Sequence, residues 1–376
     1  NNEAYMDAIN AIRIPDPTTA GDFLRRFSME DIFDLSSVIE QSNIRVALHA
    51  LSPKDKAVGI IDVDGKIQAT TGECKEKMDI TYTKEWGFSV LLLTEAVTGM
   101  HLNIVNRPGN ALSQEGAAEW MNRSINTVKQ IFRRVIMRGD SAFSLTKEFD
   151  AWDDNAVDFI FGYDAHPNLV AIAENIGKNQ WKILPHEEDR PKAPRRRRKK
   201  RFKQAAVARR GYRTLTQTKE YISEFMYRPG KCDRDYRVIV IRKHMEVTEG
   251  QHYLFDEYRY FFYITNMSNE SPEELVRLIR GRCNHENKIE QMANGVHALK
   301  MPAAEFDANW VYMLIGALAW NLKIYAGLMI PDKKISSVLL KCEYKYFQNA
   351  FINIPCQILH TGRKLVYRFL NYSPMV

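Results

Sequence analysis

The sequence predicts a mixed α/β fold, in which a sheet core is flanked by helices and interrupted by a long, mostly β segment. Two observations predict it. Strand and helix patterns follow one another between residues 57 and 163 in the order β-β-β-α-β-α-β. The stretch from about 165 to 265 differs, because it is rich in Tyr, Arg, Thr and Val.

Helix signals dominate residues 1–50. Asp16 precedes Pro17, and Ser28 precedes an acidic first turn. Asp and Ser are favoured at helix starts because their side chains accept hydrogen bonds from free backbone N–H groups, and Pro fits the first helical position. We therefore expect short amphipathic helices in this region.

Short apolar runs predict the strands of the core. The strand candidates are 57–63, 88–97, 101–105, 133–137 and 156–163, and the helix candidates among them are 113–130 and 143–152. Further on, Ser271-Pro272 with Glu274 is a helix start, and that helix should run to about Asn294. A second long helix is expected over 304–328. Asn321 and Lys323 interrupt its apolar run, so a buried core helix is favoured over a membrane span.

Charge is distributed unevenly along the 376 residues. Of the 53 Lys and Arg, thirteen lie between Arg190 and Arg213, where no acidic residue occurs, which leaves 40 basic against 46 acidic residues elsewhere. A mildly acidic body with one cationic segment points to a polyanionic partner. The composition excludes a disordered chain, a collagen-like fibre and a disulfide miniprotein.

The cysteines favour a reducing environment. Their number is odd and none forms a CxxC pair: Cys74, Cys232, Cys283, Cys342 and Cys356. A disulfide framework or a structural zinc site is therefore not expected, and the cytosol fits better. No targeting segment is evident.

Carboxylates follow two of the predicted core strands. Asp62 and Asp64 are two residues apart, so in a strand they face the same side, and Asp140 directly follows another β run. A carboxylate at the end of a core strand is disfavoured by desolvation unless a cation or hydrogen bonds compensate it. The alternative is that each is a turn residue, since Asp-Gly and Gly-Asp are common in turns.

A third acidic group lies in the helix after the β segment. Arg282, Glu286 and Glu290 recur every four residues and share one face of it. A solvated ladder of ion pairs is the simple interpretation. Gly281 inside the pattern costs about 1 kcal/mol relative to Ala, which favours a functional site. Two strand-end aspartates and one helical glutamate could hold two Mg²⁺ ions, with Mn²⁺ as a substitute, because hard cations prefer carboxylate oxygens.

Several segments together resemble bacterial insertion-sequence transposases of the DDE type, in the branch related to piggyBac transposases. The segments that carry the resemblance are Asp62-Val-Asp-Gly, Thr71-Gly-Glu-Cys-Lys, Met78-Asp-Ile-Thr-Tyr, Trp86-Gly-Phe, Asn106-Arg-Pro-Gly-Asn, Glu115-Gly-Ala-Ala and Arg138-Gly-Asp-Ser-Ala-Phe. It is strong over 57–165 and looser over 258–325. It implies an RNase H-like mixed sheet core flanked by helices and interrupted by a mostly β insertion domain.

The resemblance assigns Asp64, Asp140 and Glu286 as the metal-binding carboxylates, with Asp62 and Glu290 as fallbacks. Arg282-x-x-x-Glu286 matches the Arg-x-x-x-Glu part of a Tyr-Arg-Glu-Lys signature, and Arg282 would contact the phosphate next to the scissile bond or orient Glu286. The signature is broken at two places. Ile279 replaces its Tyr and Ala293 replaces its Lys, for which Lys288 or Lys300 are the possible substitutes.

The resemblance also implies DNA contacts. Seven residues form the densest cationic run: Arg195, Arg196, Arg197, Arg198, Lys199, Lys200 and Arg201. Such a run binds phosphates strongly and without sequence preference, and its alternative is a solvated loop. Trp181 is a candidate for stacking on a flipped base, against a core tryptophan. Arg107 is a candidate for contacting the DNA backbone, against a structural turn.

Five regions follow from this interpretation. They are a helical DNA-binding or dimerisation region (1–50), two parts of the catalytic core (51–165 and 266–330), the insertion with its basic loop (166–265) and a C-terminal region (331–376).

The predicted function is a cut-and-paste DNA transposase of the bacterial cytoplasm or nucleoid. It would act as a homodimer on transposon ends and target DNA, possess two-metal nicking and strand-transfer activity, and have no membrane partner. A hairpin intermediate and a TTAA target are implied by the resemblance alone. The alternatives are an RNase H-like endonuclease without strand transfer and a domesticated transposase that binds DNA without cleaving it.

Overall fold

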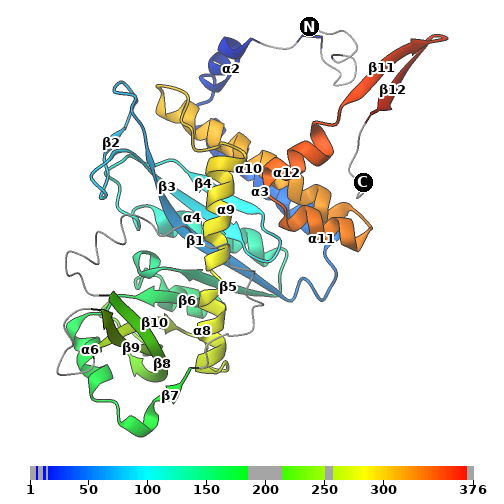
Figure 1. The fold of residues 1–376 in the computed structure, drawn as a ribbon. Helices are drawn as coiled ribbons and strands as arrows, with labels where there is room; N and C mark the ends of the chain where they lie inside the picture. Colours follow the sequence, from blue (N-terminus) through cyan, green and yellow to red (C-terminus); the bar gives the residue numbers. More distant parts are fainter. Residues whose placement is uncertain (1–5, 7–11, 14–15, 185–213, 250–256, 371–376) are drawn as a thin grey trace. The chain divides into compact units, whose positions relative to one another are not determined.

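The computed structural model describes residue 6 and residues 12–13, 16–184, 214–249 and 257–370. The chain divides into two compact units. Unit 1 comprises Asn1–Arg138 and Arg282–Val376, and unit 2 comprises Gly139–Gly281. Each unit combines helices with strands (Figure 1).

Unit 1 is built on a mixed sheet. Its strands are β1 (Val58–Ala69), β2 (Asp79–Ile80), β3 (Trp86–Glu95), β4 (His101–Val105) and β5 (Arg134–Gly139). β3 pairs antiparallel with β1, β2 and β4, and β1 pairs in parallel with β5. Helix α4 (Ala117–Lys129) connects β4 to β5. Three main antiparallel strands followed by a helix and a parallel strand confirm the predicted RNase H-like mixed core.

Helices accompany this sheet in the same unit. They are α2 (Pro17–Leu24), α3 (Met29–Ala50), α9 (Cys283–Glu290), α10 (Phe306–Met329), α11 (Lys333–Lys341) and α12 (Tyr344–Phe347). Both helix starts predicted within residues 1–50 are confirmed. Asp16 accepts a hydrogen bond from the Thr18 N–H at 2.9 Å, and Ser28 forms a reciprocal capping box with Asp31.

The core of unit 1 is aromatic where α10 meets the sheet. The Trp310 indole donates to the Ile104 carbonyl at 2.8 Å, and its ring lies 5.8 Å from the Trp120 ring. By length and composition α10 is the one described helix that could cross a membrane. Asn309, Asn321 and Lys323 are buried on it among apolar residues, as expected of a core helix.

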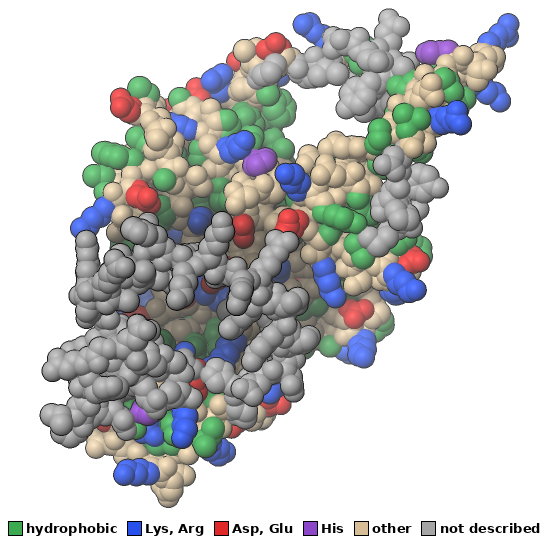
Figure 2. All heavy atoms as spheres, in the orientation of Figure 1, with side chains coloured by type: hydrophobic (Ala, Val, Ile, Leu, Met, Phe, Trp, Pro, Cys, Tyr) green, Lys and Arg blue, Asp and Glu red, His purple; other side chains and the backbone are tan. Residues whose placement is uncertain are grey.

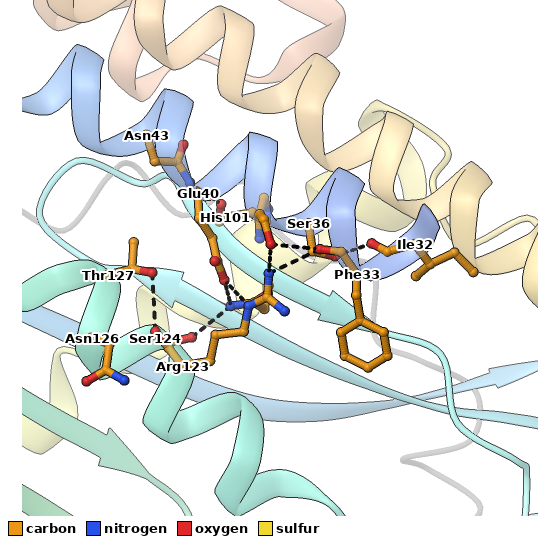
Figure 3. A network of polar contacts seen from close by, with 12 residues as sticks. Ile32, Phe33, Ser36, Glu40, Asn43, His101, Arg123, Ser124, Asn126 and Thr127 are labelled. Carbon is orange, nitrogen blue, oxygen red and sulfur yellow. Dashed lines mark hydrogen bonds and ion pairs between the residues drawn. The ribbon is translucent and has the colours of Figure 1, made fainter. Parts of the chain in front are cut away.

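A buried polar network fastens α3 to α4 and β4 (Figure 3). The Glu40 carboxylate accepts from the Arg123 guanidinium at 2.7 Å and from the Asn103 amide at 3.0 Å. Asn103 also donates to the Ser124 hydroxyl at 3.1 Å. Because buried polar groups are costly when unpaired, these hydrogen bonds favour one arrangement of the three elements.

Unit 2 is dominated by antiparallel strands. Its helices are α5 (Phe149–Asp154), α6 (Pro167–Glu174) and α8 (Pro272–Arg280), and its strands are β6 (Val157–Tyr163), β7 (Lys182–Ile183), β8 (Thr214–Tyr227), β9 (Tyr236–Glu249) and β10 (Glu257–Thr265). β10 pairs with β6 and β9, and β8 pairs with β9 and β7, all antiparallel. The expectation of a β-rich segment after residue 165 is confirmed.

Three local predictions were wrong. The helix expected over 143–152 is a 3₁₀ turn, Ser141–Phe143, followed by the short α5, because Asp140 caps the 3₁₀ turn. The helix expected over 271–294 is interrupted between Arg280 and Cys283, at the low-propensity Gly281. The C-terminal region also contains a strand pair, β11 (Cys356–Thr361) and β12 (Lys364–Phe369), that was not expected.

Candidate active site

Asp62 lies inside the core of unit 1. It stands opposite Arg138 in the parallel pairing of β1 with β5, and only 1% of Asp62 is exposed. Arg138 donates to both carboxylate oxygens, with Nη2 3.1 Å from Oδ2. A carboxylate committed in this way to a buried guanidinium serves the fold, and the geometry favours Asp64 over this fallback residue.

Asp64 has a different environment two residues further along β1. Its Oδ2 lies 2.8 Å from Nη2 of Arg282, and the side chains are 15% and 19% exposed. Asp64 also borders an open hollow of about 420 Å³. The Asp64 carboxylate is therefore paired with a cation and also borders the hollow, whereas a purely structural carboxylate would not need to be accessible.

Glu286 lines the same hollow. The lining residues come from β1, from α9 and from the π-helical turn that follows α9: Asp64, Gly65, Lys66, Glu286, Ile289, Glu290, Ala293 and Asn294. Glu286 and Glu290 are exposed, whereas Ile289 between them is buried and anchors the helix. Unit 1 thus brings together three of the predicted acidic residues and Arg282.

Lys66 also borders the hollow, and it was not among the predicted site residues. It is exposed, whereas Ala293 presents no charge there. The signal was present, because residues two apart in a strand share a face and Lys66 follows Asp64 by two. Lys288 is less suited to replace the missing lysine. Burial lowers its pKa, and its Nζ lies 3.3 Å from the Ala96 carbonyl.

Buried histidines accompany α9 on its inner side. His285 precedes Glu286 and is fully buried, and burial, followed by the charges of Lys288 and nearby cations, lowers its pKa well below the usual value. His101 on β4 behaves similarly, with a pKa lowered to about 3 by burial and then by Lys288. Both imidazoles are neutral at physiological pH.

Asp140 belongs to unit 2 and is partly exposed. Its Oδ1 accepts from the Ala142 N–H at 3.0 Å, which caps the 3₁₀ turn. Gly162 on β6 supports this position, since an added Cβ would lie 2.9 Å from the Ser141 nitrogen and 3.2 Å from the Asp140 carbonyl carbon.

The chemistry of these donors fits a hard divalent cation. Carboxylate oxygens are the ligands that Mg²⁺ prefers. In unit 1 the Asp64 carboxylate is already paired with one cation, the Arg282 guanidinium. Among the described residues, no group of three or more His, Cys, Asp or Glu side chains converges on a single point.

The other predicted DNA contacts have structural surroundings. The buried Arg107 guanidinium donates to the carbonyls of Ser89, Ser113 and Glu115 at 2.8–3.0 Å, so the geometry favours the structural turn. The largely buried ring of Trp181 lies 4.2 Å from the Arg242 guanidinium carbon, as expected of a core tryptophan. The cationic run 195–201 lies outside the described residues.

Three antiparallel strands, a helix and a parallel strand make unit 1 an RNase H-like core. The chain belongs to the family Transposase DDE domain group 1, whose model matches residues 23–375. No curated protein matches the chain.

Among solved structures, the chain is similar to a piggyBac transposase in a synaptic complex with hairpin DNA, determined by cryo-electron microscopy. The identity is 11% and the TM-score 0.41, and the match covers 90% of this chain. The chain spans 62% of the length of that transposase.

Proposed function

We propose that this protein is a cut-and-paste DNA transposase whose chemistry depends on Asp64, Asp140 and Glu286. The observation that carries the proposal is the hollow of unit 1, where Asp64 and Glu286 are accessible beside Arg282 and Lys66. Membership of the DDE transposase family supports it. The three carboxylates would hold two Mg²⁺ ions, for which Mn²⁺ could substitute.

The bound cations would supply the Lewis acidity that activates a water or a 3′-hydroxyl and stabilises the leaving oxygen of a phosphodiester. The chain itself would position the strand. Arg282, now paired with Asp64, would turn toward the phosphate next to the scissile bond, because a guanidinium binds phosphate as readily as carboxylate. Lys66 would contact the neighbouring phosphate as a point charge.

The wider reaction is proposed from the family resemblance. The protein would bind the terminal inverted repeats of its element as a homodimer, nick one strand and transfer the freed end. A hairpin intermediate and a TTAA target belong to the same proposal. The cationic run 195–201 would supply salt-dependent, sequence-independent attachment to the phosphate backbone.

The test is cleavage of a labelled duplex that carries the element's own end, with Mg²⁺, by the wild type and by Asp140→Asn. We expect the wild type to nick the duplex and the variant to lose activity by about 100-fold or more while its DNA affinity persists. Asp164→Asn is the matched control, because Asp164 is an exposed aspartate of the same unit outside the site.

Two outcomes would contradict the proposal or narrow it. Binding without nicking, in Mg²⁺ and in Mn²⁺, would contradict catalysis and favour a domesticated DNA-binding protein. Nicking without joining of the freed end to a second duplex would favour an endonuclease without strand transfer.

A further inference from the structure

The C-terminal strand pair is an unusual element of unit 1. β11 and β12 form a two-stranded antiparallel ribbon, with Cys356 opposite Phe369 and Thr361 opposite Lys364. In Figure 1 the ribbon follows α12 and is drawn in red. Each of its twelve strand residues is at least partly exposed. Because an isolated hairpin is marginally stable in water, a binding partner would stabilise this one.

The turn of the ribbon places a cation at its tip. Gly362 and Arg363 occupy the two loop positions with φ of 51° and 63°. This left-handed pair is the type I′ geometry that matches the twist of the strands. Gly and Asn adopt it with little strain. The turn leaves the Arg363 side chain exposed at the tip of the ribbon, where a polyanion could reach it.

The two faces of the ribbon differ in character. One face is mainly apolar and consists of Cys356, Ile358, His360, Leu365, Tyr367 and Phe369. The opposite face pairs Gln357 with Arg368 and Thr361 with Lys364, around a central Leu359–Val366 pair. Gln, Arg and Lys are the side chains that form specific hydrogen bonds to base edges, and apolar groups contact the thymine methyl.

The ribbon also differs from most of the chain in its net positive charge. Residues 353–370 contain Arg363, Lys364 and Arg368 and no Asp or Glu, whereas the chain outside the cationic segment 190–213 has more acidic than basic residues. Figure 2 shows Lys and Arg side chains at this end of the molecule. The charge complements a polyanion.

We infer that the ribbon β11–β12 is a second DNA-binding element, which inserts into the major groove of duplex DNA with the Gln357–Arg368 face toward the bases. A six-residue strand spans about 20 Å, and the groove, about 12 Å wide, admits a two-stranded ribbon. The inference rests on the proposed function for the identity of the partner. It adds a sequence-reading contact far along the chain from the cationic run 195–201.

The first experiment removes the ribbon charges without disturbing its turn. The full-length variant Arg363→Asn, Lys364→Gln, Arg368→Gln keeps a residue suited to the left-handed position at the tip. Its matched control removes three exposed charges from α11 as Lys333→Gln, Lys334→Gln, Lys341→Gln. The probe is a labelled 30-bp duplex of random sequence, titrated across a range of salt concentrations.

We expect the ribbon variant to lose about tenfold or more in affinity. The slope of its plot of log K against log salt should decrease by about 0.9 for each phosphate contact that is lost. The control should stay within about threefold of the wild type. Equal losses in the two variants, or none, would overturn the inference.

The second experiment tests sequence reading with Arg368→Lys, which keeps the charge but loses the two-pronged hydrogen-bond geometry. Selection from a duplex library with randomised central positions should show an altered base preference for this variant. An unchanged preference would overturn the base-reading orientation. If the charge variant instead shifts the protein toward monomer in sedimentation without DNA, the ribbon binds a second copy and the inference is wrong.

These results are separable from the catalytic proposal. If the ribbon variant still nicks saturating DNA in Mg²⁺, the proposed function stands, and the measured affinity alone tests the role of the ribbon. Loss of nicking in Asp140→Asn with an unchanged affinity would concern only the carboxylates.

Discussion

Two Asp–Arg pairs lie two residues apart along β1, and they differ in what surrounds them. Asp62 and Arg138 are buried, with two hydrogen bonds between them, whereas Asp64 and Arg282 are partly exposed beside a hollow of about 420 Å³. The charges and the side-chain types are the same. The difference in burial therefore gives the pairs different roles. The buried Asp62–Arg138 pair joins two core strands, whereas Asp64 and Arg282 can exchange partners.

The difference has an energetic basis. A buried charge whose partner is removed keeps its full desolvation cost, whereas an exposed one recovers hydration. Asp62 and Arg138 therefore offset the desolvation cost that each of them incurs on burial. Asp64 and Arg282 can separate when a phosphate or a cation offers a better partner.

Removal of the buried carboxylate should have the largest effect on stability. Asp62→Asn leaves the Arg138 charge uncompensated in the core, and we expect the free energy of unfolding to fall by about 3–5 kcal/mol. Urea denaturation at pH 7 measures it. A loss below about 1 kcal/mol would show that the two pairs do not differ as described.

Replacement of the whole buried pair should restore most of that loss. Asp62→Leu with Arg138→Met removes both charges, and exchange of a buried ion pair for apolar residues is often neutral or stabilising. The double variant should unfold at a urea concentration near that of the wild type. If it is as unstable as Asp62→Asn, packing rather than uncompensated charge explains the single variant.

The buried histidines near these pairs should make unit 1 sensitive to acid. The pKa of His101 is about 3 in the folded chain, below its value of 6.5 when unfolded, so the unfolded state binds the proton more readily. Its stabilising contribution is complete above pH 6.5 and is lost as the pH falls toward 3. His101→Phe, which can still pack against Trp320, should reduce the slope of stability against pH by up to about 1.4 kcal/mol per unit. An unchanged slope between pH 6.5 and 4.5 would contradict the neutral-histidine assignment.

The accessible pair should respond weakly in stability. Arg282→Gln leaves a carboxylate that still reaches water, and we expect a change in the free energy of unfolding below about 1 kcal/mol. Its effect should appear in the rate of nicking of saturating DNA instead. If Arg282→Gln greatly reduced the stability and left nicking normal, Arg282 would have the structural role that is assigned to Arg138.

Lys66 should have the smallest effect. Lys66→Gln removes one exposed cation from the hollow, which corresponds to about one phosphate contact. The slope of log K against log salt should then decrease by about 0.9, with little change in folding. Lys84→Gln, at an exposed turn elsewhere in unit 1, is the control that should leave the slope unchanged.

Much of the fold could be predicted because local signals were unambiguous. The caps at Asp16 and Ser28, and the order of strands in the core, followed from residue types and spacing. The ribbon β11–β12 was missed because its strands are only six residues long and carry apolar residues on both faces, which obscures the alternation that predicts a strand.

The candidate site could be predicted only as far as residue types indicate chemistry. The spacing of Arg282, Glu286 and Glu290 predicted one helix face, and both glutamates border the hollow with Asp64. Residue spacing could not distinguish Asp62 from Asp64, because the two aspartates face the same side of one strand. They differ in the partner that folding brings to each, and the buried partner of Asp62 is Arg138, which is distant in sequence.

The most direct test compares these two aspartates in one assay of Mg²⁺-dependent nicking of the element's own end. We predict that Asp64→Asn folds with wild-type stability, binds the duplex and does not nick it. Glu119→Gln, which changes an exposed carboxylate on α4, should nick normally. Asp62→Asn should lose stability first and should nick whenever it is folded. Normal nicking by Asp64→Asn, or a folded Asp62→Asn that cannot nick, would contradict the assignment of the accessible pair to catalysis.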